Sequence, residues 1–268
     1  MQYSQKIFSG NKKLLYAWFQ VMFTRVDLML YDEIEREDLI DIAHEIENEI
    51  VRIESFTNRF DENSLLSHAN RSAYHESVQL IPELFEILTA CQHYKEQTKG
   101  YFDVAAQTAD LNYVGVDKFV LDAENCSVRF QQPNVNLDLS GYIKGYALGL
   151  VISILKEKNI ANALINVGNS SIYALGNHPA GNGWKVAVPA TNFECILVNE
   201  CLTTSGNNAD TKWPIINPLT GNVAEIKLPV SVITADPAIG EVLSKVANLA
   251  PEAELDLILR KFNARLVK

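Results

Sequence analysis

The residues of this chain best placed to do chemistry lie in the stretch NLDLSGYIKGYALGL, residues 136–150. A strand-like run ends at Ser140-Gly141, and an amphipathic helical pattern follows almost at once, with Lys144 and a second glycine, Gly145, in its first turn. Glycine lets the main chain come close to a ligand, and a helix N-terminus offers free N–H groups to an anion. With one cation added, this pattern predicts a site for a phosphate-containing ligand.

Three other stretches share this character, a strand end followed by small or polar residues. They are Tyr101-Phe102-Asp103, Thr204-Ser205-Gly206-Asn207 and Ala235-Asp236. Asp236 stands at a predicted strand-to-helix turn, where its carboxylate is available to a divalent cation. Taken alone, each stretch is most often an ordinary turn, so the predicted site depends on whether the fold brings them together.

The composition is that of an ordinary globular protein, and it limits the class of ligand. The chain has 268 residues, of which 47% are apolar and 21% charged, and we expect a single domain over 1–268. Its net charge of −10 would repel a nucleic-acid backbone, so we expect no nucleic-acid partner. The four cysteines lack metal-site spacing and are expected to be free, mostly buried thiols.

The sequence contains no segment typical of membrane insertion or export. No apolar run approaches the ~20 residues that a membrane-spanning helix needs, and the N-terminal residues lack the apolar core and cleavage site of a secretory signal. The expectation is therefore a cytoplasmic protein without a transmembrane segment. A periplasmic or membrane-anchored protein whose export signal was removed is the alternative.

The elements that must position these residues are a mixture of helices and strands. Residues 14–31 are rich in aromatic and β-branched side chains and predict one or two strands. Apolar residues at spacings of three and four predict a long helix within 32–60, whereas 60–70 has the composition of a loop. Further helices are predicted over 82–100, 142–158, 237–249 and 251–263, with short strands between them. This arrangement favours an α+β protein with largely antiparallel sheets.

In this order and spacing, the motifs resemble those of the ApbE family, the FAD:protein FMN transferases. The segments that carry the resemblance are Met22-Phe23-Thr24, ENSLLSHAN, KGYFDVAAQ, DLSGYIKGYALG, NVGNSSIYALG, TTSGNN, PIINPLTG and ADPAIGEVLSKV. Together they cover the chain from about residue 20 to its C-terminus. The resemblance implies an ApbE-like architecture, related to the T-fold, in which mixed, largely antiparallel sheets pack with helices.

The resemblance also implies an activity. In such enzymes FMN is transferred from FAD to a Ser or Thr hydroxyl of a target flavoprotein, AMP is released, and Mg²⁺ bridges the FAD pyrophosphate. The implied cofactors are thus FAD and Mg²⁺, and the implied partners are FAD and an acceptor flavoprotein. Phosphoryl transfer of this kind needs charge neutralisation and in-line positioning more than covalent help from the protein.

Matching positions carry the family's residue roles onto this chain. The catalytic residues would be Asp236 and Lys144, and the metal ligands would be the side chain of Asp236 and the carbonyl of Ile143. The residues that hold the dinucleotide would be Met22, Phe60, Tyr101, Phe102, Asp103, Ser140, Gly141, Tyr146, Thr204, Ser205 and Gly206. For the aromatic residues at 101, 102 and 146, plain core packing is the alternative interpretation.

The chain departs from the family's pattern at several of these sites. Pro214 and Asn217 stand where the family has His and Asp, and Gly240 stands where it has the Thr that helps hold Mg²⁺. Asp236 is then the remaining side-chain oxygen for the metal. Phe23 replaces a small glycine and would narrow the pocket. These losses at one site indicate weakened metal-dependent chemistry.

Two alternatives to an active transferase therefore stay open. One is a catalytically degenerate relative that binds FAD or another dinucleotide without transferring it. The other is an interaction module that keeps the family's shape and binds no flavin. Metal-dependent release of AMP from FAD separates the transferase from the binding protein, and a flavin absorption band in the purified protein separates the binding protein from the interaction module.

Overall fold

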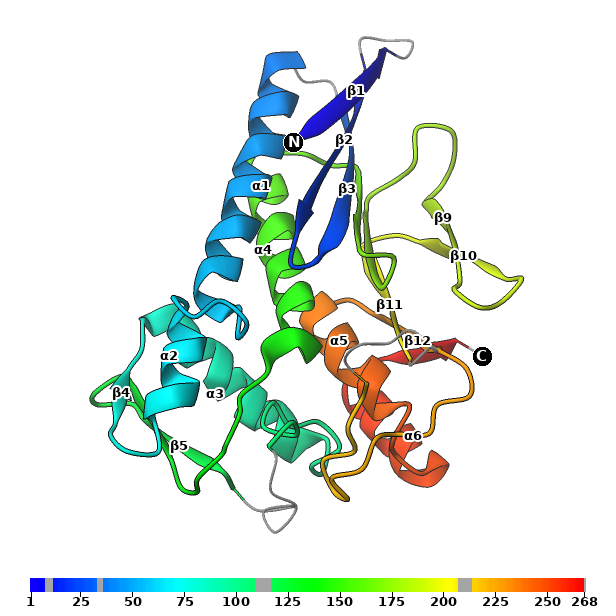
Figure 1. The fold of residues 1–268 in the computed structure, drawn as a ribbon. Coiled ribbons are helices and arrows are strands. Elements are labelled where there is room, and N and C mark those ends of the chain that lie inside the picture. Colours follow the sequence, from blue (N-terminus) through cyan, green and yellow to red (C-terminus); the bar gives the residue numbers. More distant parts are fainter. Residues whose placement is uncertain (8–11, 33–35, 109–116, 207–213, 268) are drawn as a thin grey trace.

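The computed structural model describes residues 1–7, 12–32, 36–108, 117–206 and 214–267. An eight-stranded sheet forms its centre, and the long helices α1 and α4 lie side by side along it (Figure 1). All strand pairs within the described ranges are antiparallel. The predicted α+β class, with largely antiparallel sheets packed with helices, is confirmed.

The central sheet has the strand order β1-β2-β3-β7-β8-β11-β12-β13. Its strands are β1 Gln2–Ile7, β2 Lys13–Val21, β3 Thr24–Asp32, β7 Ala163–Val167, β8 Ser171–Leu175, β11 Glu200–Ser205, β12 Val230–Thr234 and β13 Arg265–Val267. The two strands expected within 14–31 are β2 and β3. Val21 pairs with Thr24, so Met22 and Phe23 form a two-residue hairpin turn, and both have the positive φ (52° and 56°) that such a turn requires.

Two smaller sheets are separate from the central one. The strands β4 Val78–Gln79, β6 Ser127–Phe130 and β5 Phe119–Asp122 form one, and β9 Trp184–Ala187 with β10 Glu194–Leu197 forms the other. Trp184 is buried in a small apolar cluster with Leu202 and Ile233, separate from the main core. Because side chains alternate along a strand, the sheet supplies one face to this cluster and the opposite face to the helices.

The helices are α1 Arg36–Thr57, α2 Leu65–Ser72, α3 Pro82–Gln97, α4 Ile143–Glu157, α5 Pro237–Val246 and α6 Glu252–Lys261. The apolar stripe expected on α1 is buried as predicted. The loop expected at 60–70 is wrong in its second half, since α2 begins there. Ser64 caps α2 by accepting a hydrogen bond from the Ser67 amide, and Leu66 and Ala69 are fully buried.

The character of the helices and the state of the cysteines also bear on the sequence predictions. Within the described ranges, none of the helices combines the length and apolar character needed to cross a bilayer. The four cysteines are free, with Cys91 and Cys201 buried and Cys126 and Cys195 partly exposed.

The contact between α4 and α5 positions the motif that opened the sequence analysis. A Cβ placed on Gly145 would lie 2.3 Å from the Pro237 carbonyl oxygen and 2.7 Å from the Ala238 Cα, so α5 approaches α4 at main-chain distance. A Cβ on Gly141 would instead lie 3.0 Å from Cε of Lys245, near the end of α5. The two helices therefore run in opposite directions, and α5 lies beside the whole Gly141–Gly145 segment.

We expect Gly145→Ala to lower the free energy of unfolding by about 1–3 kcal/mol, because the added methyl group forces two main chains apart. Gly149→Ala is the matched control, since a Cβ at Gly149 has nothing within 4 Å. That control should gain about 0.5–1 kcal/mol from the better helix propensity of alanine. Both are measured by chemical denaturation; an equal gain in the two variants would show that α4 and α5 do not touch at Gly145.

Candidate functional site

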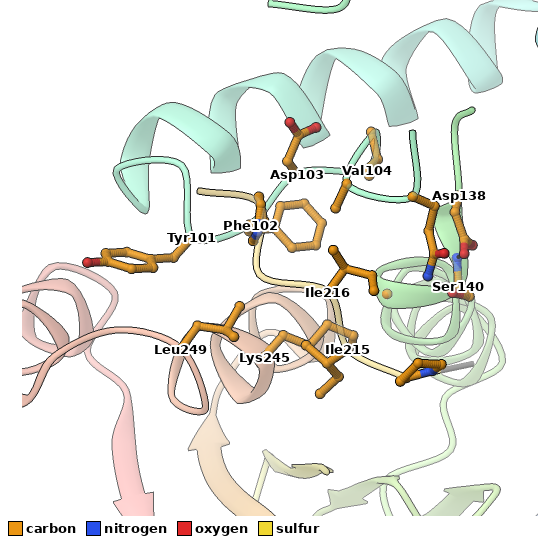
Figure 2. Close-up of a pocket in the computed structure, with 15 residues that line it drawn as sticks. Tyr101, Phe102, Asp103, Val104, Asp138, Ser140, Ile215, Ile216, Lys245 and Leu249 are labelled. Carbon is orange, nitrogen blue, oxygen red and sulfur yellow. Dashed lines mark hydrogen bonds between the residues drawn. The ribbon is translucent and has the colours of Figure 1, made fainter. Parts of the chain in front are cut away.

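Two hollows meet at the turn that precedes α4. The Phe102 hollow is lined by Tyr101, Phe102, Asp103, Val104, Ala106, Gln107, Asp138, Ser140, Gly141, Pro214, Ile215, Ile216, Pro218, Lys245 and Leu249 (Figure 2). The Phe60 hollow is lined by Met22, Phe23, Glu54, Thr57, Asn58, Arg59, Phe60, Asp138, Ser140, Ile143 and Lys144. They enclose about 110 and 120 Å³ and share Asp138 and Ser140. The fold thus brings together most of the residues predicted to bind the dinucleotide.

The Phe102 hollow is bounded by residues from four segments that are distant in the sequence. Phe102 and Ile216 face each other across it, with Ile215 and Lys245 below (Figure 2). Tyr101 and Phe102 line the hollow and are also 9% and 4% exposed members of the main core. The positions of these two rings are therefore compatible both with the predicted ligand contact and with the alternative, packing in the core.

Asp103 has its carboxylate engaged within the protein. Its Oδ1 accepts from the Ala105 amide at 2.8 Å, and its Oδ2 lies 3.5 Å from Nζ of Lys95 and 3.4 Å from Nζ of Lys118. Lys118 is itself 4% exposed. Asp103 therefore holds its own loop in shape, and it lines the hollow as a neutralised group.

The Phe60 hollow has an aromatic mouth. The rings of Phe23 and Phe60 meet edge to face with centroids 5.9 Å apart, and the Arg59 guanidinium lies 4.4 Å from the centre of the Phe60 ring. Phe23 is 81% exposed, so its ring stands at the rim of the hollow rather than filling its base. Met22 and Phe60, predicted to contact a ring system of the ligand, lie where they can do so.

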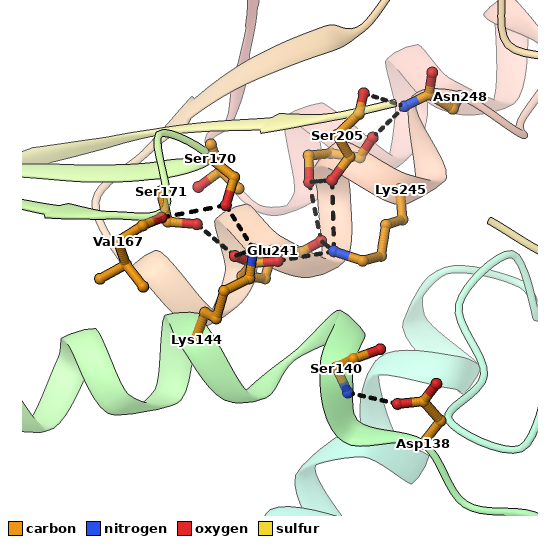
Figure 3. Close-up of polar contacts among 12 residues, drawn as sticks. Asp138, Ser140, Lys144, Val167, Ser170, Ser171, Ser205, Glu241, Lys245 and Asn248 are labelled. Carbon is orange, nitrogen blue, oxygen red and sulfur yellow. Dashed lines mark hydrogen bonds and ion pairs between the residues drawn. The ribbon is translucent and has the colours of Figure 1, made fainter. Parts of the chain in front are cut away.

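The turn between the hollows is fixed by Asp138. Its Oδ1 accepts from the Ser140 amide at 2.8 Å, and its Oδ2 lies 3.2 Å from Nε of Arg59 (Figure 3). The short 3₁₀ turn Leu139–Gly141 follows, and α4 begins two residues later without a side-chain cap on its N-terminal N–H groups. Ser140 is exposed to both hollows. An anion at Ser140 would meet uncapped amides and the positive end of a helix dipole.

A buried carboxylate lies behind this turn. Glu241 is 1% exposed; its Oε1 lies 3.5 Å from Nζ of Lys144, its Oε2 lies 2.8 Å from Nζ of Lys245, and Ser171 donates a hydrogen bond to it (Figure 3). Lys144 also donates to Ser170 Oγ at 2.5 Å. Lys144, expected from the resemblance to act as a catalytic residue, is therefore half-buried and anchored by these contacts while it lines the Phe60 hollow.

The pKa shifts in this cluster follow from one anion being shared by two cations. Burial alone would raise the pKa of Glu241, but Lys144, Lys245 and Ser171 outweigh it and lower the pKa to about 2. Burial lowers the pKa of Lys245, which Glu241 offsets in part and the like charge of Lys144 reinforces. Glu241 is therefore ionised at neutral pH.

Asp236 is placed at the N-terminus of α5. Its Oδ1 accepts from the amides of Ala238 at 2.7 Å and Ile239 at 3.4 Å, and the residue is exposed. Its Oδ2 makes no hydrogen bond within the described part of the chain. Gly145 contacts Pro237, so the carboxylate lies close to the start of α4, where Ile143 lines the Phe60 hollow.

These residues fit a divalent ion shared with a ligand, and they do not form a protein-only metal site. Within the described ranges there is no group of three His, Cys, Asp or Glu side chains that could hold a metal. A Cβ at Gly240 would lie 2.5 Å from Thr203 Oγ1 and 2.9 Å from Thr234 Oγ1, so two hydroxyl groups already occupy that space. Mg²⁺ in proteins commonly keeps several waters and binds one or two carboxylates together with ligand phosphates. Oδ2 of Asp236 is available as one such carboxylate ligand.

Other predicted site residues lie outside both hollows. Tyr146 donates to Glu83 at 3.0 Å, on the side of α4 that faces α3. The hydroxyl groups of Thr204 and Ser205 bond to Ser231 and Ser244, each at 2.7 Å. Gly206 packs against Pro229, and Asn207 is outside the described residues. The ligand-binding roles of these residues stay predictions.

Pro214 and Asn217, two of the positions at which this chain departs from the family's pattern, lie at or next to the Phe102 hollow. Pro214 lines the Phe102 hollow, where it offers no side-chain hydrogen bond. Asn217 uses Oδ1 to accept from the Leu219 amide at 2.9 Å and so stabilises its own turn. Neither residue supplies an acid or base to the site.

Glu241 and Lys245 were missed by the sequence reasoning. They lie four residues apart within the apolar stretch PAIGEVLSKV, and such a pair of charges on a buried helix face is the signal that could have identified them.

We expect Glu241→Gln to lower the free energy of unfolding at pH 7 by about 3–5 kcal/mol, because it leaves two lysines without their buried counter-ion. The folded pKa is depressed, so the stabilisation is complete above pH 4.5 and is lost as the pH falls toward 2. The difference from the wild type should therefore shrink between pH 4.5 and 3. Denaturant titrations at pH 7, 4.5 and 3 measure it, with the exposed Glu96→Gln as control; a gap that stays constant with pH would contradict the assignment.

The sequence of this chain is similar to those of known FAD:protein FMN transferases. An FAD:protein FMN transferase of Chlamydia muridarum is 28% identical over 232 residues, which cover 75% of this chain and 73% of that protein. An FAD:protein FMN transferase of Klebsiella pneumoniae is 29% identical over 149 residues, 52% of this chain and 47% of that one.

Solved structures share the fold at lower identity. The flavin transferase ApbE from Vibrio cholerae superposes with a TM-score of 0.81 at 16% identity, over 99% of this chain and 93% of that chain. The ApbE protein from Thermotoga maritima gives 0.78 at 20% identity, over 95% and 94%. The sequence profile of the ApbE family matches residues 22–110 and 105–266. Since that match extends over most of the chain, the protein belongs to the ApbE family, which its motifs resemble.

Proposed function

We propose that this protein is a flavin transferase that moves FMN from FAD to a Ser or Thr hydroxyl of a target flavoprotein, with Mg²⁺ and with release of AMP. Its family membership and the FAD:protein FMN transferases among its relatives support the proposal. The structural observation that carries it is the pair of hollows joined at Ser140, with two lysines behind the junction.

The shape of the site favours a dinucleotide. Each hollow is smaller than the roughly 300–1,000 Å³ of a typical small-molecule pocket, so neither encloses such a ligand alone. A molecule with two ring systems joined by a diphosphate can place one ring against Phe60, the other against Phe102, and its charge at Ser140. FAD has this construction.

In the proposed reaction, the acceptor hydroxyl oxygen forms a bond to the phosphorus on the FMN side of the diphosphate. The bond from that phosphorus to the bridging oxygen breaks, the bridging oxygen leaves with AMP, and the hydroxyl proton passes to solvent. The protein contributes position and charge: the hollows fix the two rings, while the uncapped amides of α4 and the ammonium of Lys144 face the diphosphate. Mg²⁺, held by Asp236 and the Ile143 carbonyl, would neutralise the developing negative charge when bound.

The proposal is tested by incubating the protein with FAD and Mg²⁺, with and without an acceptor flavoprotein in its unmodified form, whose target Ser or Thr hydroxyl is free. We expect AMP to be released and the acceptor to gain the mass of an FMN moiety, and EDTA to suppress both. If FAD binds but neither AMP nor the modified acceptor is formed, transfer is excluded and the protein is a flavin-binding relative. If FAD does not bind, both functions are excluded.

The second function has a specific observation in its favour. The space where a side chain at 240 would lie is filled by the hydroxyl groups of Thr203 and Thr234, so the local packing is adapted to glycine rather than to a metal ligand. Dinucleotide binding without transfer needs the hollows and the lysines but no precisely held metal. The AMP measurement above decides between the two functions.

Asp236→Asn separates the charge of this residue from its role as a helix cap. Asparagine caps a helix as well as aspartate does, so the fold should be retained, while the loss of the carboxylate should slow Mg²⁺-dependent AMP release by about 100-fold or more. Asp256→Asn, on the exposed face of α6, is the matched control and should leave the rate unchanged. Unaltered turnover in Asp236→Asn, with an unchanged melting temperature, would exclude Asp236 as a metal ligand.

A further inference from the structure

The buried charge cluster behind the Ser140 turn contains a cation to which no role has been given. The family resemblance gives Lys144 a role, whereas it gives none to Lys245, which lies near the end of the matching segment ADPAIGEVLSKV. A buried ion pair contributes little net stability compared with apolar packing, and the α4–α5 contact is otherwise apolar. Stability alone therefore does not explain why a lysine lies at position 245.

Lys245 and Lys144 are arranged on opposite sides of one carboxylate. Glu241 is 1% exposed, while the side chains of Lys144 and Lys245 are 24% and 19% exposed. Lys144 lines the Phe60 hollow and Lys245 lines the Phe102 hollow, and Ser140 belongs to both (Figure 3). A single buried anion thus holds one cation at the edge of each hollow, next to their junction.

The main chain makes room for this arrangement. The Lys245 side chain crosses Gly141, where a Cβ would lie 3.0 Å from its Cε and 3.2 Å from its Cδ. A larger residue at 141 would displace Lys245 from the turn. The glycine that allows close approach of the main chain to a ligand therefore also admits the lysine.

The ammonium of Lys245 has hydrogen-bonding capacity for an anion. Its Nζ donates to Glu241 Oε2 at 2.8 Å, and it makes two longer contacts, to the Glu241 carbonyl at 3.2 Å and to Ser205 Oγ at 3.5 Å. A phosphate oxygen can replace the longer contacts without breaking the ion pair, and hydrogen bonds between charged groups are about twice as strong as neutral ones. The cluster carries two positive charges and one negative charge, in a protein with a net charge of −10.

We propose that Lys245 binds the diphosphate of the dinucleotide from the side of the Phe102 hollow, as a second cation beside Lys144. The inference rests on the proposed function in that the ligand spans both hollows. It assigns part of the charge neutralisation to the protein, in a site where Gly240 supplies no metal ligand.

The test measures the dissociation constant of FAD by flavin fluorescence in EDTA, so that metal binding does not contribute. We expect Lys245→Gln to bind FAD about 10- to 100-fold more weakly than the wild type. Riboflavin, which has no phosphate, should bind both proteins equally. Lys185→Gln is the matched control, since Lys185 is 68% exposed and pairs with Glu194 on the β9–β10 hairpin.

Three results would overturn the inference. Equal FAD affinity of Lys245→Gln and wild type would show that Lys245 does not reach the diphosphate, while the proposed function would survive. An equal loss of FAD and riboflavin affinity would show that Lys245 acts through packing alone. Absence of FAD binding in the wild type, both in EDTA and with Mg²⁺, would overturn this inference and the proposed function together.

A second measurement uses the unmodified protein and so does not depend on the stability of a variant. An amine-reactive reagent is applied with and without FAD, and labelling of each lysine is quantified by mass spectrometry. We expect FAD, but not riboflavin, to slow the labelling of Lys245 while Lys185 is unaffected. Labelling of Lys245 at the same rate with and without FAD would contradict the proposal.

Discussion

The site depends on the close contact between α4 and α5. Gly145 allows the main chain of Pro237 to approach α4, and Gly141, one turn earlier, allows Lys245 to approach the Ser140 turn. Close to this contact, the buried Glu241 of α5 forms two ion pairs, one with Lys144 of α4 and one with Lys245 of α5. The same contact that joins the helices therefore also sets the electrostatic potential of the junction between the hollows.

The departures from the family's pattern form a consistent local structure. At Gly240 the missing side chain is compensated by Thr203 and Thr234, whose hydroxyl groups occupy its place, so a threonine there would collide with two buried side chains. On the same helix, Glu241 follows Gly240 directly and Lys245 lies one turn after Glu241. The position that supplies no metal ligand and the cation proposed to bind the diphosphate thus lie on one helix.

The elements with strong periodicity could be predicted from sequence, and those fixed by long-range contacts could not. The β2–β3 hairpin, α1 and α4 were predicted because their apolar patterns extend over many residues. The helix α2 was missed because it is short and polar, and its cap and burial decide its structure. In the site, the family resemblance identified Met22, Phe60 and Ser140, but the sequence did not show that Asp103 is neutralised by Lys95 and Lys118. Such pairing depends on tertiary structure, and so does the pairing of Glu241 with both Lys144 and Lys245.

The two proposed sources of positive charge at the junction, a metal bound at Asp236 and the lysines that pair with Glu241, differ in their exposure to water. Asp236 is open to solvent, so a metal bound there competes with water and is screened by salt within about 10 Å at 0.1 M. The Glu241 cluster is shielded from water on the side of α5, and its two ammonium groups are held before any ligand arrives. A charge that is already desolvated and oriented costs little reorganisation when the diphosphate binds. In the proposed function, binding of the dinucleotide would follow from the lysines and the hollows, and the metal would act mainly in the chemical step.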